Sequence, residues 1–324
     1  MNYSEALDYL DAHAVYEKTG QIEAPSLGNI ERLLSVMGDP QHTYPVIHVT
    51  GTNGKGSTSQ MITRLLMAHG LTVGTYSSPH LERINERMSH NCEPIDDEEF
   101  GDQVGSVADL EIVAGVRPSY FEITTAAALR WFSDIAVDVA VVEVGLLGRW
   151  DATNVVDAQV AVITNVALDH MEFAGPTKLD IAREKAGIIK PNSAVVVGET
   201  DPELVEVFRE AGGAVVLERG EQFDCLENQL AVGGRLVDLR TPTTVYSDLF
   251  IPLHGRHQGD NAAVALTAVE AFFASPVPEE LVIEAFGSVV MPGRFEVLNH
   301  LPLVIVDGAH NPAGADTCAQ VFFE

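Results

Sequence analysis

The stretch that decides the fold is Val46-Ile47-His48-Val49-Thr50-Gly51-Thr52-Asn53-Gly54-Lys55-Gly56-Ser57. Its first four residues predict a short strand, and the segment from about Ser57 to Ala68 predicts a helix that Gly70 stops. A glycine-rich loop between a strand and a helix is a phosphate cradle, because its backbone N–H groups and the helix N-terminus both favour anions.

The loop also carries chemistry of its own. Lys55 supplies a positive charge, and Ser57 offers a hydroxyl to Mg²⁺. The strict Walker pattern is not met, because Val49 and Gly56 stand where glycine and Ser/Thr are required. The string TGTNGKGS instead resembles the form used by Mur-type and folate-type amide ligases. The alternative to a phosphate site is a glycine-rich turn that binds no ligand. Lys55 and the position of the loop between a strand and a helix disfavour this alternative.

Strand and helix patterns alternate on both sides of this loop. Apolar strand candidates lie at 72–76, 137–142, 160–166 and 194–197, and helix candidates lie at 57–68, 121–132 and 181–186. This alternation predicts an α/β fold with a doubly wound, mostly parallel sheet and helices on both faces. Between Phe223 and Ile251, short strand-like pieces separated by turns predict a small antiparallel patch attached to the main sheet.

The C-terminal part of the chain contains a further series of predicted elements. A long helix is predicted at 260–273, Met291-Pro292-Gly293 interrupts the chain, and a strand at 303–306 precedes a helix that begins near Ala313. The interruption predicts a domain boundary near residue 293, with the beginning of a second α/β domain over 294–324. The resemblance of the glycine loop to that of Mur-type and folate-type ligases implies that residues 1–293 are an ATP-binding Mur ligase-like domain and that residues 294–324 begin an incomplete C-terminal glutamate ligase domain.

Composition narrows the possible partners and the compartment. The chain has 324 residues and a net charge of −28, so a nucleic-acid partner, which needs a basic face, is not expected. A high-salt habitat would favour this acid excess, and so would drift in a GC-rich genome. No apolar run is long enough to cross a bilayer, and the N-terminus does not read as a signal peptide. Three scattered cysteines, Cys92, Cys225 and Cys318, predict a reduced, cytoplasmic protein.

Polar residues stand at the ends of successive predicted strands. Glu143 ends one strand, Ser78 follows another, and His170 follows a third by a short loop. Ligands of doubly wound sheets bind outside the carboxyl ends of the strands. Mg²⁺ accepts a few such protein ligands and keeps water and phosphate oxygens as the rest. Each residue alone is more often a solvated or hydrogen-bonded loop residue, and their joint occurrence after successive strands is what predicts a metal site.

Further strings resemble one family, in that family's order, across about residues 26 to 312. The family is the folylpolyglutamate synthase/dihydrofolate synthase family of the Mur ligase superfamily. The strings are YSSPH at 76–80, ERINER at 82–87, SYFEITT at 119–125, VEVG at 142–145, GRWDATN at 148–154, DH at 169–170, IAREKAGIIK at 181–190, HQ at 257–258 with Asn261-Ala262, MPGR at 291–294 and DGAHNP at 307–312.

The resemblance implies a role for each matched residue. The implied ATP contacts are Thr52, Asn53, Gly54, Lys55, Gly56, Ser57, Asn261, Arg294 and Asp307. Two Mg²⁺ ions would be surrounded by Ser57, Ser78, Glu143 and His170, and by Lys185 if it is carbamylated as in the family. Lys55, Lys185 and His170 would be the catalytic residues. Phe121, Glu122 and Asp151 would line the site of the pterin-bearing substrate. Without the family, Lys185 reads as a surface lysine and Phe121 as a core residue.

The implied reaction is an ATP-dependent ligation. A carboxylate of dihydropteroate or of a reduced folate attacks the γ-phosphate of ATP and becomes an acyl phosphate, and the amine of L-glutamate then displaces phosphate and forms an amide. Magnesium and Lys55 neutralise the charge that gathers on the phosphoryl oxygens. A monomer that binds only small molecules is expected.

Two departures from the family pattern stand out. Leu147 occupies a position where the family usually has glycine, which alone accepts strained backbone regions cheaply. The family also continues through a C-terminal domain, about a hundred residues longer than the part present here. We therefore expect this polypeptide to bind nucleotide poorly and to ligate weakly or not at all. The alternatives are a Mur-type ligase acting on a cell-wall precursor and a nucleotide-binding form without turnover.

Overall fold

A computed structural model of the chain describes residues 1–13 and 26–324. Its centre is an eight-stranded sheet with the order β4-β3-β2-β5-β1-β6-β7-β8. The strands from β2 to β8 in this order are parallel, and β3 and β4 add an antiparallel edge. The strands are β1 (Val46–Thr50), β2 (Val73–Tyr76), β3 (Met88–His90), β4 (Glu93–Pro94), β5 (Val139–Glu143), β6 (Val160–Ile163), β7 (Ala194–Val197) and β8 (Val215–Glu218). The predicted doubly wound α/β sheet is confirmed.

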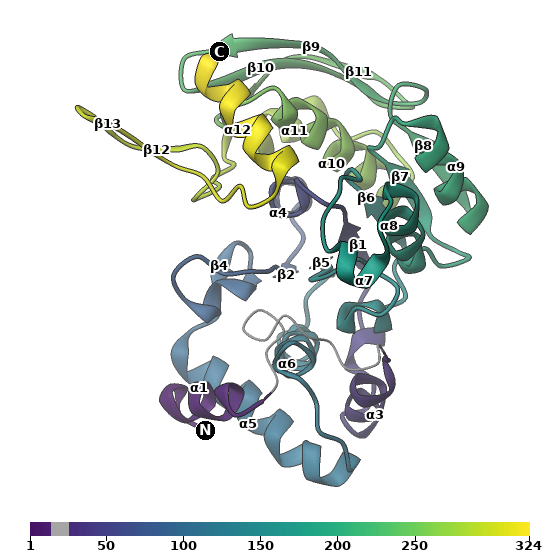
Figure 1. The fold of residues 1–324 in the computed structure, drawn as a ribbon, viewed down its shortest axis with the longest axis vertical. Helices are drawn as coiled ribbons and strands as arrows, with labels where there is room; N and C mark the ends of the chain where they lie inside the picture. The colour runs from purple at the N-terminus through teal and green to yellow at the C-terminus, as the bar shows by residue number, and fades with distance from the viewer. Residues whose placement is uncertain (14–25) are drawn as a thin grey trace.

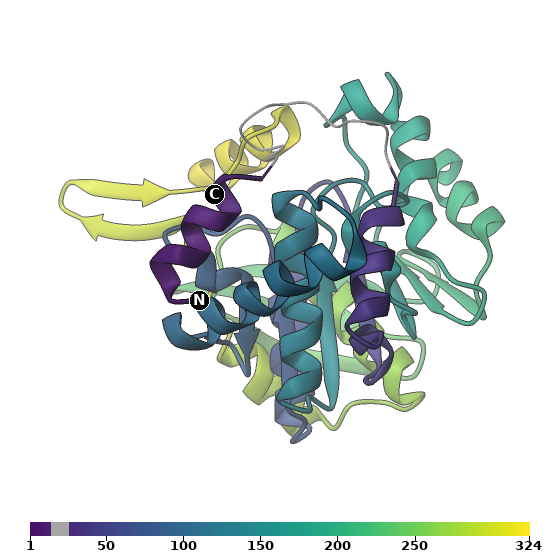
Figure 2. The ribbon, with the colours of Figure 1, turned by 90° about the horizontal axis from the view of Figure 1, so that it is seen from below.

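Helices cover both faces of this sheet (Figures 1 and 2). The α-helices are α1 (Tyr3–Asp11), α3 (Gly28–Val36), α4 (Lys55–Ala68), α5 (Asp97–Ala114), α6 (Tyr120–Asp134), α7 (Met171–Ala174), α8 (Lys178–Lys185), α9 (Pro202–Ala211), α10 (His257–Phe273), α11 (Glu279–Gly287) and α12 (Pro312–Phe323). The 3-10 turns are η1 (Pro40–His42), η2 (Ile84–Arg87), η3 (Ala152–Val155) and η4 (Ala186–Ile188).

The alternation of side chains along β1 sets the two faces. Ile47 and Val49 point into a core made with α4, α10 and α11. Val46 belongs to the opposite core, which is made with α1, α3, α5 and α6. Successive side chains of a strand point to opposite faces, so a strand that is apolar throughout is buried on both. All five residues of β1 are buried, which places the loop that follows it at the centre of the molecule.

The predicted antiparallel patch exists, but the prediction that it is attached to the main sheet is wrong. Strands β9 (Asp224–Ala231), β10 (Gly234–Arg240) and β11 (Val245–Ile251) form a separate three-stranded sheet. Buried residues of this sheet, such as Val237 and Leu249, pack in the same core as α4, α10 and α11. The apolar side of the small sheet therefore covers the helices rather than extending the ladder (Figure 1).

Two predicted strand boundaries also shift at the edge where the loops gather. The strand predicted at 160–166 ends at Ile163, and the one predicted at 137–142 runs as Val139–Glu143. The first shift has a visible cause: Thr164 Oγ1 donates to Asn53 O at 2.6 Å, and Asn165 Nδ2 donates to the same carbonyl at 3.0 Å. These side chains bind the glycine loop, so the chain leaves the sheet there.

After Gly293 the chain forms a hairpin and a helix. Strands β12 (Glu296–His300) and β13 (Leu303–Val306) pair antiparallel, and both views show the hairpin reaching away from the main body (Figures 1 and 2). Residues of helix α12 and of the first turn of α4 line one cavity. Within the part of the chain that the structure describes, no helix combines the length and the apolar character needed to span a bilayer.

Candidate nucleotide and ligase site

The glycine loop joins β1 to α4 as the sequence predicted. Gly54 stands at the N-terminus of α4 with a φ of 82°, and a Cβ there would lie 2.6 Å from Asn261 Oδ1. Only glycine meets both requirements, because L side chains rarely adopt this backbone region. Lys55 Nζ donates to Gly51 O at 3.1 Å and to Thr52 O at 3.3 Å. The loop thus folds around its own lysine at the N-terminus of α4.

A cavity of about 250 Å³ opens beside this loop. Seven residues predicted to contact ATP line it together: Asn53, Gly54, Gly56, Ser57, Asn261, Arg294 and Asp307. They come from the glycine loop, from α10 and from the segment around the β12–β13 hairpin. Thr52 and Lys55 lie in the loop itself but are not part of the cavity wall. Tertiary structure therefore gathers in one place residues that are more than 250 positions apart in the sequence.

Glu143 reaches this region from the end of β5. Its side chain is buried, and a Cβ at Gly56 would lie 3.7 Å from Glu143 Oε2. Burial raises the pKa of Glu143 to about 7, although Lys55, Arg294 and the backbone N–H of Ser78 all favour its charged form. A buried carboxylate in this state is stabilised by a bound cation. The predicted ligands Ser57, Ser78 and Glu143 thus meet at the first turn of α4.

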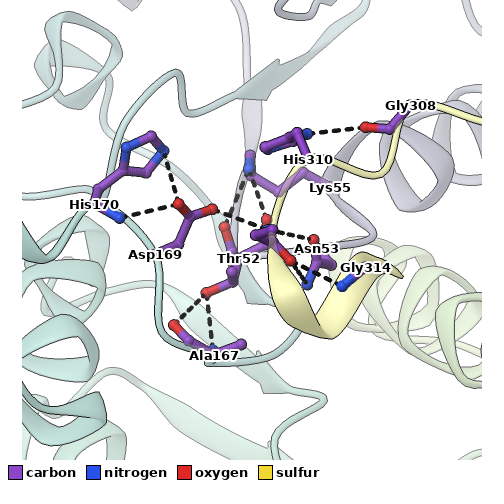
Figure 3. A network of polar contacts seen from close by, with 11 residues as sticks. Thr52, Asn53, Lys55, Ala167, Asp169, His170, Gly308, His310 and Gly314 are labelled. Atoms are coloured by element: carbon purple, nitrogen blue, oxygen red, sulfur yellow. Dashed lines mark hydrogen bonds and ion pairs between the residues drawn. The ribbon is translucent and has the colours of Figure 1, made fainter. Parts of the chain in front are cut away.

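Asn53 also belongs to a polar network that crosses the site (Figure 3). Asn311 Nδ2 lies 3.0 Å from Asn53 Oδ1 and 3.0 Å from Asp169 Oδ2, and it donates to both. Asn311 Oδ1 caps α12 by accepting from Gly314 N at 2.8 Å. One side chain therefore ties the glycine loop, the loop after β6 and the start of α12 together.

His170 and Lys185 both lie close enough to Lys55 for its charge to lower their pKa values. His170 is in the left-handed region with a φ of 50°, and its Nε2 lies 3.7 Å from Asp169 Oδ1. Lys185, the last residue of α8, is 3% exposed, which corrects its reading as a surface lysine. Burial lowers the pKa of Lys185 well below its usual value, and the charge of Lys55 lowers it further, against Asp169 and Asp151. A neutral buried amine is the nucleophilic form of lysine.

The three predicted acceptor-site residues form a second group, around the start of α6 and the loop after β5. Phe121 is only partly buried, so it is not a plain core residue, and it packs where a Cβ at Gly145 would lie 2.4 Å from its ring. Glu122 Oε2 accepts from Ser119 N at 2.7 Å and completes the N-terminal capping box of α6. Asp151 Oδ2 accepts from Leu146 N at 2.7 Å. In this structure Glu122 and Asp151 organise the backbone around the group.

Leu147 confirms the expectation about its loop. Its φ is 59°, in the left-handed region that glycine adopts at low cost. Its carbonyl accepts from Thr50 Oγ1 at 2.6 Å, and its side chain packs beside the core formed with α8 and α9. Local contacts therefore hold a leucine in a conformation that costs roughly 1 kcal/mol or more.

Several residues of the site carry no role in the sequence-based prediction. Asn165, Asp169 and Asn311 form the network described above, and His257 and Gln258 line the cavity from the start of α10. Four of them stand inside quoted strings, namely DH, HQ and DGAHNP, but a string does not tell which of its side chains points inward. Among the described residues, no group of three His, Cys, Asp or Glu side chains forms a ready metal cage.

Known proteins match both the sequence and this architecture. The sequence profile of the Mur ligase middle domain matches residues 49–269. The chain is 41% identical to the dihydrofolate synthase/folylpolyglutamate synthase of Mycobacterium tuberculosis over 91% of this chain and 66% of that protein. It is 37% identical to the folylpolyglutamate synthase of Lacticaseibacillus casei over 97% of this chain and 75% of that protein.

A solved folylpolyglutamate synthase complex with AMPPCP and folate superposes with a TM-score of 0.94 at 34% identity, over 100% of this chain and 80% of that one. The chain thus spans about two thirds to four fifths of the length of these relatives. The shared middle domain, the level of identity and the superposition agree with one another. The chain therefore belongs to the folylpolyglutamate synthase/dihydrofolate synthase family, ATP-dependent glutamate ligases that carry a Mur ligase middle domain.

Proposed function

We propose that this chain ligates L-glutamate to dihydropteroate, to reduced folates or to both, with ATP as the energy source. The observation that carries the proposal is the cavity beside the glycine loop, whose wall combines Gly54 and Ser57 with Asn261, Arg294 and Asp307. In this proposal, residues 1–293 form the ATP-binding domain and hold the acceptor. Residues 294–324 begin the C-terminal glutamate ligase domain, and Arg294 and Asp307 of that segment add contacts to the nucleotide.

ATP fits the cavity on physical grounds. Its phosphates would lie at the N-terminus of α4, where backbone N–H groups and the helix dipole favour anions. Arg294 adds a cation to the wall, and Lys55 lies in the loop beside it. Because the attack of a carboxylate on the γ-phosphate needs little covalent help, catalysis here rests on holding the two reactants in line.

The side chains at the phosphate end also fit magnesium. Glu143 is a buried carboxylate whose pKa is raised to about 7 by burial, and a divalent cation would relieve that desolvation. Ser57 and Ser78 would complete one set of ligands, and His170 would belong to a second. When bound, Mg²⁺ would neutralise charge on the phosphoryl oxygens. Few protein ligands suffice, because Mg²⁺ retains water and phosphate oxygens.

Lys185 is suited to carbamylation. Carbamylation joins the neutral amine of Lys185 to carbon dioxide, forms an N–C bond and releases one proton. The amine is buried and its pKa is lowered, which supplies the required neutral form. The product is a carboxylate on a side chain that interacts electrostatically with Lys55 and His170. This carboxylate would serve as a ligand of the second metal.

The acceptor would enter beside the loop after β5. Phe121 offers a partly exposed ring for stacking, with Tyr76 5.9 Å away between ring centroids. Asp151 and Glu122 hold the backbone on both sides of that ring. Such an arrangement suits a flat heteroaromatic group whose carboxylate end points toward the nucleotide.

The test is a ligation assay with the protein in excess over acceptor, so that slow turnover is detected. The chain is incubated with Mg-ATP, L-glutamate and either dihydropteroate or tetrahydrofolate, and phosphate release and product mass are followed. We expect a slow gain of one glutamyl residue with at least one acceptor, which is the weak ligation that the sequence analysis allows. The acceptor that reacts names the substrate. The Mycobacterium tuberculosis relative is the positive control, and reactions without L-glutamate correct for ATP hydrolysis. No mass gain with either acceptor, beside an active control, would refute the proposal.

A further inference from the structure

We infer that His48 is a positioning residue, which couples the strand of the glycine loop to the acceptor-side loop at residues 145–151. His48 is fully buried in β1, two residues before the start of the glycine loop. Its Nε2 lies 2.9 Å from Thr153 Oγ1, and Thr153 in turn contacts Asp151. The inference rests on the proposed function, because it gives a role in acceptor binding to a residue that touches no reactant.

The direction of these hydrogen bonds follows from the donors available. Asp151 as a carboxylate only accepts, and Thr153 Oγ1 donates its single proton to Asp151 Oδ1 at 2.5 Å. Thr153 Oγ1 must then accept from His48, so the proton of the neutral imidazole is on Nε2. Asp151 Oδ2 accepts from Leu146 N at 2.7 Å, and Gly145 N also donates to this carboxylate. The chain of bonds therefore runs from β1 to the backbone that packs under Phe121.

A second bond from the same strand supports the coupling. Thr50, on the same face of β1 as His48, donates from Oγ1 to Leu147 O at 2.6 Å. Two neighbouring side chains of the glycine-loop strand thus hold one loop at two points. That loop continues to Arg149, whose N–H donates to Glu184 O at 2.9 Å, next to Lys185. The position of the loop is set between the ATP side and the end of α8.

The other ring nitrogen of His48 indicates that the residue does more than fill space in the core. Nδ1 of His48 is buried and has no hydrogen-bond partner among the described residues. Burial of an unpaired polar atom is unfavourable, so an apolar side chain of similar size suits the interior better than this histidine does. Within the described part of the chain, the bond to Thr153 is the one hydrogen bond that the ring makes. What His48 contributes is therefore the position of Thr153 and Asp151.

The test compares His48→Leu with His48→Gln. Leucine keeps an apolar volume and removes the donor, whereas the Nε2 of glutamine stands near the position of the imidazole Nε2 and restores it. With acceptor as the varied substrate, we expect kcat/KM of His48→Leu to fall about tenfold, because that is roughly the effect of losing one hydrogen bond. The KM for ATP should stay within twofold of the original, and His48→Gln should recover most of the loss.

Amide hydrogen exchange gives a readout that does not need turnover. Leu146 N–H is protected through Asp151, so His48→Leu should exchange it about tenfold faster while His48→Gln does not. Unchanged exchange in His48→Leu would overturn the inference, and so would faster exchange with unchanged acceptor kinetics. If the original chain has no turnover, the proposed function fails, and the exchange measurement still decides whether His48 holds the loop.

Discussion

Asn311, which begins the last helix, donates a hydrogen bond of 3.0 Å to Oδ1 of Asn53 in the glycine loop, across 258 positions of sequence. The same amide group also donates to Asp169, and the side-chain oxygen caps α12. The side chain of Asn311 therefore fixes the wall of the nucleotide cavity formed by α12 to the phosphate-binding wall.

Replacement of Asn311 should loosen both walls at once. We expect Asn311→Ala to weaken binding of a non-hydrolysable ATP analogue about tenfold, because it removes a helix cap and two inter-loop bonds. Isothermal titration calorimetry measures the change in Kd. Asn299→Ala is the matched control, since among the described residues the side chain of Asn299 bonds only within its own turn. Its Nδ2 donates to Leu301 O, and its Oδ1 accepts from His300 N and Leu301 N. Equal affinities for the two variants would contradict the role of Asn311.

Leu147 offers a test in which the usual order of two substitutions reverses. Leu147→Ala and Leu147→Gly both remove the packed side chain, but only glycine relieves the positive φ. We expect the glycine variant to be about 1 kcal/mol more stable than the alanine variant, although alanine is normally the more stable of the two. Urea unfolding of both proteins provides the comparison. A more stable alanine variant would show that the backbone there is not strained.

We expect Lys185 to lower the stability of the folded protein while it is required for ligation. Because the pKa of Lys185 is lowered in the folded state, the unfolded chain binds the proton more tightly and folding is penalised at neutral pH. We expect Lys185→Met to raise the free energy of unfolding of the ligand-free protein by about 1 kcal/mol or more and to abolish ligation. Lys178→Met, an exposed lysine on the same helix, should change neither property. A destabilised Lys185→Met protein would count against this account.

His48 predicts a specific pH dependence of stability. Burial, with a smaller effect of Lys190, lowers the pKa of His48 from 6.5 to about 3. Below pH 6.5 the unfolded chain takes up a proton that the folded chain does not, so stability is lost as the pH falls from 6.5 toward 3. At pH 5 this loss amounts to about 2 kcal/mol relative to neutral pH.

The charged groups near the His48 ring are Lys190 and, beyond Thr153, Asp151. His48→Gln keeps the hydrogen bond to Thr153 and removes the titration, so its stability should fall less between pH 7 and pH 5 by that amount. Urea unfolding at several pH values measures the difference. Parallel pH profiles for the two proteins would mean that His48 is accessible to protons in the folded state.

The sequence determined the class of fold and the place of the phosphate site, because both depend on local chemistry. The apolar residues of β1, the glycines and Lys55 specify a strand, a loop and a helix within twelve residues. The alternation of such units allows only a parallel sheet with helices on both faces. The strings that resemble the family predicted in addition which residues contact ATP, magnesium and the acceptor. The role of each of these residues stays a prediction, although most of the predicted ATP contacts line one cavity.

Only the tertiary structure decided which side chains of those strings point inward and what they touch. Lys185 reads as a surface lysine by its helix pattern, yet the packing of α8 against the loop after β5 buries it. The prediction that the small antiparallel sheet is attached to the main sheet was wrong, because the pattern of a strand does not tell which layer it joins. Contacts such as Asn53 with Asn311 and His48 with Thr153 join distant segments. Such contacts depend on the relative placement of whole elements, which the core fixes and local sequence does not encode.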